Sequence, residues 1–214
     1  MSQRRIAIVA GTTRKTVGRK FLFTAMLARQ EHESRIAGGK LKTGLAQFDE
    51  METFEHTRMK PVTVAIAVRA KTGEILGIRC AELGYKGPLA AMARQKYGYR
   101  EDKSASAVQG VLETLQRCAR SNLKVVTDAN PRYRLCIPRA LPGATHAFVK
   151  RCFEKTDRKN KDDALFTLNY TAAKIRNDLS RMARKTWVTT KKLDRLQAHM
   201  DLYIAWNNGY RLAA

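Results

Sequence analysis

Two apolar, strand-forming runs each deliver an aspartate, and together they constrain the fold more than any other feature of the chain. Leu45–Phe54 carries Asp49 and Lys124–Tyr133 carries Asp128, in each case at or just past the end of the predicted strand. Carboxylates at strand ends can converge at one edge of a sheet. Because divalent cations prefer carboxylate oxygens, the pair predicts a metal site.

The chain is strongly basic along its whole length. It holds 41 Lys and Arg against 19 Asp and Glu, a formal net charge of +22. Residues 1–42 contain ten Lys/Arg and two Glu, a net charge of +8, and residues 150–195 again carry +8. This balance favours nucleic acid over a membrane surface as the partner. With the aspartate pair, it predicts metal-assisted chemistry on nucleic acid.

Composition excludes several classes of protein. No apolar run approaches the ~20 residues of a membrane span, and no secretory signal is visible, so we expect a cytoplasmic protein without a membrane partner. The four cysteines are scattered without a Cys-x-x-Cys pair, which disfavours a zinc ribbon. A hydrophobic content of 44% in 214 residues is enough for one substantial core.

Residues 3–28 have the pattern of a helix-turn-helix. Arg4–Val9 predicts a short helix, Gly11 a tight turn, and Thr12 or Thr13 the cap of a second helix. An ordinary basic helical hairpin that packs on the core is the alternative. The side chains placed for DNA contact are Arg14, Lys15, Arg19 and Lys20.

Residues 29–44 are polar, include Gly38-Gly39 and predict a linker. The expected division is therefore a DNA-binding segment with its linker over residues 1–44 and a catalytic domain over residues 45–214. Because the chain begins at the first helix of the motif, a preceding helix or module is an open alternative.

The order of the remaining elements predicts an α/β fold. Three strands come first, then a helix, a strand, a loop or short helix, a strand and a long helix. Their predicted bounds are Leu45–Phe54, Pro61–Arg69, Glu74–Ala81, 104–120, Leu123–Thr127, Pro131–Leu141, Thr145–Val149 and Asp163–Lys185, before a final helix over Thr190–Trp206. This is the order of a ribonuclease-H-like mixed sheet flanked by helices. In such a sheet the first strand is central, the fourth lies beside it and the long helix packs across, which would make Asp49 and Asp128 neighbours.

Three segments carry a resemblance to a known family: Phe48–Phe54, Val126–Tyr133, and Ile175–Trp187 followed by Thr190-Lys191. They resemble the DDE-class transposases of small bacterial insertion sequences. The resemblance covers roughly residues 45–208. It implies that two aspartates and a glutamate on the long helix bind two divalent ions, Mg²⁺ or Mn²⁺. It also implies that an N-terminal helix-turn-helix binds the element ends, and it leads us to expect a homodimer on DNA at the bacterial nucleoid.

One departure from the family concerns the third metal ligand. Counting back from Arg184-Lys185-Thr186 places Asn169 where the family has its glutamate, and an amide oxygen brings no charge to the metal. Asp163, 35 residues after Asp128, and its neighbour Asp162 are alternatives, although either could instead cap the long helix. Glu154 and Asp157 are further candidates in the preceding loop.

The resulting functional hypothesis is a DNA transposase that cleaves element ends and transfers strands into target DNA. Basic residues close to the proposed metal site favour a DNA-binding face made of Lys174, Arg176, Arg181, Arg184, Lys185, Lys191 and Lys192. Asn169 supports the runner-up, a catalytically impaired relative that only binds DNA. A structural RNA-binding protein of ribosomal type is compatible with the charge but requires neither the helix-turn-helix pattern nor the aspartates.

Overall fold

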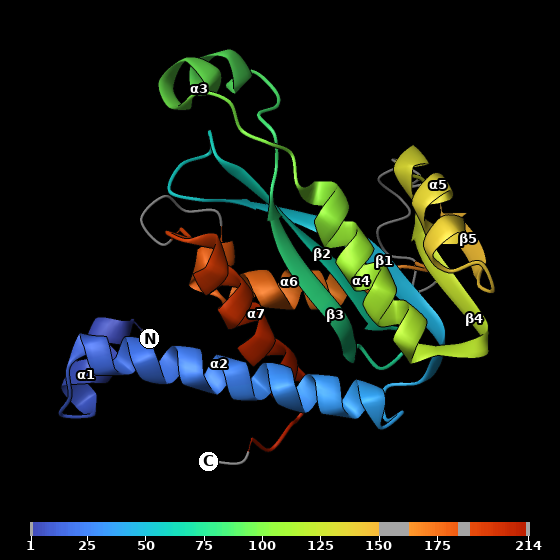
Figure 1. Ribbon diagram of the computed structural model, residues 1–214, viewed down its shortest axis with the longest axis horizontal. Coiled ribbons are helices and arrows are strands. Elements are labelled where there is room, and N and C mark those ends of the chain that lie inside the picture. Colours follow the sequence, from blue (N-terminus) through green and yellow to red (C-terminus); the bar gives the residue numbers. More distant parts are fainter. Residues whose placement is uncertain (1, 150–162, 184–188, 213–214) are drawn as a thin grey trace.

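The computed structural model describes residues 2–149, 163–183 and 189–212, and its centre is a five-stranded mixed sheet (Figure 1). The strands are β1 (Thr43–Phe54), β2 (Pro61–Arg69), β3 (Ile75–Glu82), β4 (Ala119–Asp128) and β5 (Thr145–Val149), in the order β3-β2-β1-β4-β5. β1 pairs antiparallel with β2 and parallel with β4. The predicted central position of the first strand beside the fourth is confirmed.

Both faces of the sheet are covered, and this explains the sequence of its strands. All seven interior residues of β2 are buried, as expected of a continuous apolar run between two helical layers. On one face, Phe48 packs with helices α4 (Ser104–Cys118) and α5 (Pro131–Ala140). On the other, Met51 packs with α6 (Phe166–Asp178), the short 3₁₀ helix η2 (Ser180–Met182) and α7 (Leu193–Asn207).

The N-terminal helices form as predicted, but the second is longer than predicted. Helix α1 (Gln3–Val9) ends before Gly11, whose φ of +56° makes the turn, and the Thr13 side chain caps α2 (Arg14–Ala37) by accepting from the Thr16 amide. The predicted linker over residues 29–44 is therefore wrong for residues 29–37, which are helical.

The second half of α2 lies against α7 and β3. Arg29 bonds to the Asp201 carboxylate, and His32 contacts the Tyr210 hydroxyl and the Leu76 carbonyl. Ala25, Ala28 and Ile36 are buried on the same side of α2. They form an apolar face that packs on the core, which a polar linker would lack. Division of the chain at residue 44 stays a prediction.

The predicted long helix over Asp163–Lys185 is also wrong in its extent. Helix α6 ends at Asp178, and Leu179 takes an extended conformation (φ −105°, ψ 101°). This break lets Leu179 and Met182 both enter the core, while the Tyr203 hydroxyl donates to the Asp178 carboxylate. Tertiary packing thus outweighs the helical period of the sequence. Residues 184–188 lie outside the described part of the chain.

Helix α3 (Ala90–Tyr97), between β3 and α4, was not predicted and lies beyond the C-terminal end of β3, away from the β2–β3 turn (Figure 1). Arg100 secures the returning chain by donating to the Leu83 and Pro61 carbonyls. Among the helices described here, none has the length and apolar character that crossing a membrane requires.

Candidate active site

Asp49 and Asp128 lie on adjacent parallel strands in matching register. Gln47 of β1 is opposite Val126 of β4, an offset of 79 residues, and the same offset relates Asp49 to Asp128. By strand alternation, Asp49 shares the sheet face of Met51, and Asp128 shares that of Val126, which is the α6 face. Asp49 and Asp128 therefore each lie two residues beyond Gln47 and Val126, the last pair of β1 and β4, on the same face of the sheet.

The predicted strand-end placement is confirmed for Asp128, the last residue of β4, and is wrong for Asp49. Strand β1 continues to Phe54, so Asp49 lies in its interior. The reason is that β1 keeps β2 as a partner on its other side, with Asp49 opposite Ile66, after its pairing with β4 has ended. Asp49 therefore faces the opening where β1 and β4 separate.

Tyr133 of α5 reaches this opening from the opposite face of the sheet. Its ring packs edge-on against Phe48, and its hydroxyl lies 3.3 Å from the Asp49 Oδ1 and 3.1 Å from the Glu50 Oε2. Burial, followed by the charges of Glu50, Asp49 and Asp128, raises the pKa of Tyr133 far above its usual value. The phenol stays neutral and donates to the carboxylates, so it is a positioning group for Asp49.

Glu50 belongs to the same polar cluster but has structural partners. Its Oε1 accepts from the Thr63 hydroxyl at 2.9 Å, and its Oε2 lies 3.5 Å from the Arg132 guanidinium. Arg132 also donates to Ser104 at the start of α4. Glu50 therefore ties β1 to β2 and α5 and holds the backbone that carries Asp49.

Gln47 fixes the start of α6 over β1. This buried side chain accepts from the Leu168 amide at 2.8 Å and donates to the Ala164 carbonyl at 2.6 Å. Leu168 is the third residue of α6, where a helix has no backbone partner for its N–H, so Gln47 caps the helix from the strand. Gln47 lies two residues before Asp49 on the same face of β1. Its hydrogen bonds therefore fix the position of the start of α6 relative to Asp49 and Asp128.

The two candidates for a third ligand, Asp163 and Asn169, contact each other. Asn169 Nδ2 donates to Asp163 Oδ2 at 3.0 Å, and Asp163 Oδ1 accepts from the Leu165 amide at 2.9 Å. Both side chains are exposed. Asp163 thus caps the turn that leads into α6. The N-cap residue of the helix itself is Leu165, which makes no side-chain cap hydrogen bond, so the alternative prediction that Asp163 caps the helix is wrong. Asp162, Glu154 and Asp157 lie outside the described residues.

Across residues 2–149, 163–183 and 189–212, no group of three or more His, Cys, Asp or Glu side chains is arranged to hold a metal ion. The described candidate site is therefore the Asp49–Asp128 pair, with the Asp163–Asn169 pair at the start of the helix that covers the same face. A carboxylate pair of this kind suits a hard divalent cation that keeps several of its waters.

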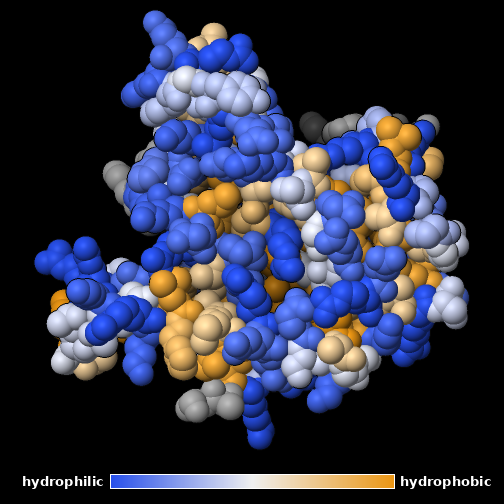
Figure 2. All heavy atoms as spheres, in the orientation of Figure 1, coloured by the Kyte–Doolittle hydropathy of each residue, from blue (hydrophilic) through white to orange (hydrophobic). Residues whose placement is uncertain are grey.

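The predicted DNA-binding residues of the N-terminus are all exposed. Arg14, Lys15, Arg19 and Lys20 come from the first two turns of α2, beyond the part of the helix that packs on α7. Figure 2 shows that hydrophilic side chains dominate the surface over α1 and the start of α2. The N-terminal arm, residues 3–20, therefore exposes these four cationic side chains to solvent.

The predicted basic residues near the metal site are placed unequally. Lys191 and Lys192 are exposed just before α7, whereas Arg176 is half-buried. Arg181 is half-buried too and donates to the Arg195 carbonyl at 2.8 Å, and its burial lowers its pKa. Arg184 and Lys185 lie outside the described residues.

Comparisons with known proteins give little further support. The sequence matches no protein-family model, and no curated protein matches it. Two similar solved structures are Mos1 mariner transposase catalytic domains. One, with raltegravir and Mg, has 13% identity and a TM-score of 0.39 over 87% of this chain and 85% of that chain. The other has 11% identity and a TM-score of 0.31 over 91% and 96%. Likenesses this weak establish neither a shared fold nor a shared activity.

Proposed function

We propose that this protein is a DDE-type DNA transposase that uses divalent metal ions to cleave element ends and transfer strands into target DNA. The observation that carries the proposal is the register of β1 and β4, which brings Asp49 and Asp128 to one face of the sheet. The basic N-terminal arm supports DNA as the substrate. A homodimer on DNA is part of this proposal.

In the proposed site, Asp49 and Asp128 hold Mg²⁺ or Mn²⁺. The metal would supply activation of water or a 3′-hydroxyl and stabilisation of the leaving oxygen. Tyr133 keeps Asp49 in place through its neutral hydroxyl. Gln47 holds the start of α6 against β1, two residues before Asp49.

The test is metal-dependent nicking of double-stranded DNA that carries the element ends. Asp49→Asn and Asp128→Asn replace a charged oxygen by a neutral one with little change in shape, and each is expected to abolish nicking. Glu113→Gln removes a carboxylate from the exposed surface of α4 and is the matched control. Undiminished nicking in both aspartate variants would sink the catalytic proposal.

The third ligand needs its own pair of variants. Asp163→Asn retains an oxygen that can accept from the Leu165 amide but removes the charge, so activity lost here identifies Asp163 as a ligand. Asn169→Glu places a second carboxylate beside Asp163, and the two charges repel unless a cation bridges them. If Asn169 occupies the glutamate position, Asn169→Glu raises nicking above the wild-type rate. If Asp163 is the ligand, Asn169→Glu brings no gain.

The second candidate function is a DNA-binding protein that has lost metal chemistry. Its support is the neutral Asn169 together with the lack of a three-ligand group among the described residues. This function predicts sequence-selective DNA binding without nicking in wild type, Asn169→Glu or Asp163→Asn. Such a result would decide for the second candidate.

A further inference from the structure

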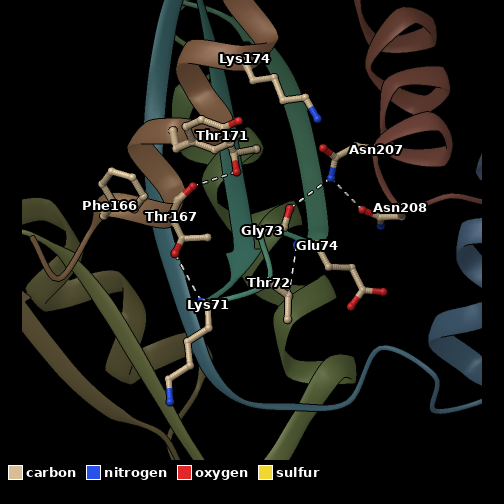
Figure 3. Close-up of a pocket in the computed structure, with 11 residues that line it drawn as sticks. Lys71, Thr72, Gly73, Glu74, Phe166, Thr167, Thr171, Lys174, Asn207 and Asn208 are labelled. Atoms are coloured by element: carbon tan, nitrogen blue, oxygen red, sulfur yellow. Dashed lines mark hydrogen bonds between the residues drawn. The ribbon is translucent and has the colours of Figure 1, made fainter. Parts of the chain in front are cut away.

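A hollow lies where α6 meets the β2–β3 turn and the end of α7 (Figure 3). Its volume is about 550 Å³. The turn contributes Lys71 through Glu74, and Figure 3 shows Lys174 extending from α6 toward Asn207. The remaining lining residues are Phe166, Thr167, Tyr170, Thr171 and Asn208.

The floor of this hollow is fixed by hydrogen bonds. Asn207 Nδ2 donates to the Gly73 carbonyl at 3.1 Å, and Asn208 bonds to both the amide and the carbonyl of Ile75. The Thr167 hydroxyl accepts from the Lys71 amide. Gly73 has a φ of +72°, and a Cβ there would lie 3.4 Å from the Thr171 hydroxyl. The cavity is therefore formed before any ligand arrives.

Three aromatic side chains in or beside the hollow are exposed to solvent: Phe166 and Tyr170 line it, and Trp206 lies next to the lining residue Lys174. Phe166 is 58% exposed, and Tyr170 and Trp206 are each 61% exposed. The rings of Phe166 and Tyr170 are nearly parallel, 17° apart with centroids at 6.1 Å. The Lys174 ammonium lies 4.8 Å from the centre of the Trp206 ring. Exposed rings so close together, interleaved with cations, are the composition of a platform for unpaired bases.

The charges at the hollow suit a phosphate backbone. Lys71 and Lys174 line it, and Glu74, the acid among the lining residues, forms an ion pair with Arg69. The local balance is therefore positive in a chain that carries +22 overall. Lysines set beside exposed rings can bind the phosphates of a strand whose bases stack on those rings.

We propose that this hollow binds an unpaired segment of DNA, with bases stacked on Tyr170 and Trp206 and phosphates near Lys71 and Lys174. The site lies apart from the aspartates. Thr167, Thr171 and Lys174 occupy one flank of α6, and Asn169 occupies the other by the helical period. The β2–β3 turn lies beside the start of β1, since the Ala70 amide donates to the carbonyl of Leu45, four residues before Asp49. The inference rests on the proposed function, because cleavage of the two strands at staggered positions leaves unpaired ends.

The experiment measures binding of fluorescent oligothymidylate, about ten nucleotides long, to the full chain by anisotropy in EDTA. Tyr170→Ala is expected to weaken binding roughly 5- to 150-fold, the range for loss of one stacked base. Tyr170→Phe retains a ring and is expected to bind like wild type. Tyr99→Ala removes an 86% exposed ring after α3 and is the matched control.

A spectroscopic readout separates contact from a structural effect. Bases stacked on Trp206 quench its fluorescence, and Trp206→Phe is expected to remove that quenching while binding persists. If Tyr170→Ala and Trp206→Ala both bind oligothymidylate like wild type, the inference is overturned. Retained duplex nicking that depends on Asp49 and Asp128 would show that the proposed function survives that failure. Loss of oligothymidylate affinity in Tyr170→Ala, with duplex affinity unchanged, supports the inference.

Discussion

The Gln47→Ala variant tests the contact that places α6 relative to the aspartates. Gln47 is only 5% exposed, and its amide satisfies the Leu168 N–H and the Ala164 carbonyl at once. Alanine removes both hydrogen bonds and leaves a buried donor without its partner, at a cost of about 1–3 kcal/mol. With the second lost bond, we expect the free energy of unfolding to fall by about 2–4 kcal/mol.

The assay is urea unfolding of the whole chain followed by circular dichroism. An unchanged m-value with a lower midpoint reports a true loss of stability. In a chain of this size, about 3 kcal/mol also lowers the Tm by roughly 6–12 °C. Gln109→Ala removes an exposed glutamine of α4 whose side chain donates to Glu113, and its effect should stay within about 0.5 kcal/mol.

Nicking activity provides the second readout of Gln47→Ala. Because Gln47 is two residues from Asp49 and holds the helix start near Asp163 and Asn169, its loss should lower activity at temperatures where the fold persists. Stability and activity both equal to wild type would refute the reasoning that this side chain couples α6 to β1.

Three further predictions concern two buried polar groups and the salt dependence of DNA binding. Tyr133→Phe retains the packing on Phe48 but removes the hydroxyl that donates to Asp49. Nicking should therefore fall, while the free energy of unfolding should drop by only about 0.5–1.5 kcal/mol. A large loss of stability with little loss of nicking activity would contradict the positioning role. Burial, Arg181 and the chain N-terminus lower the pKa of His199 from 6.5 to about 4. As the pH falls, the unfolded state therefore binds the proton before the folded state does. The free energy of unfolding should be highest above pH 6.5 and should fall by about 2–3 kcal/mol toward pH 4. His199→Leu should flatten that profile in urea midpoints, and a parallel profile would argue against it. DNA affinity should fall steeply between roughly 50 and 200 mM salt, and a flat dependence would remove DNA as the main partner.

The sheet could be predicted from the sequence because its signals are local. Pro61–Arg69 and the Lys71-Thr72-Gly73 turn specify a hairpin through β-branched residues and a turn with Gly73 at φ +72°. The offset between Asp49 and Asp128 is visible in the sequence, and the structure adds that the strands pair at the same offset.

The parts that could not be predicted depend on contacts between distant residues. Helix α6 ends at Asp178 because Leu179 and Met182 both enter the core, although the apolar period continues beyond it. Residues 29–37 are polar enough for a linker, but α7 offers them Asp201 as a partner for Arg29. Gln47 carried a signal, since a polar residue on the inward face of an apolar strand must find buried partners.

Metal binding at the aspartate pair tests the central claim most directly. Electron paramagnetic resonance of free Mn²⁺ during titration reports how much of the ion the chain binds, independently of any DNA. We expect wild type and Glu113→Gln to bind Mn²⁺, and Asp49→Asn and Asp128→Asn each to lose that binding, since we propose that both carboxylates hold the same ion. Mn²⁺ binding that is unchanged in both aspartate variants would contradict the account.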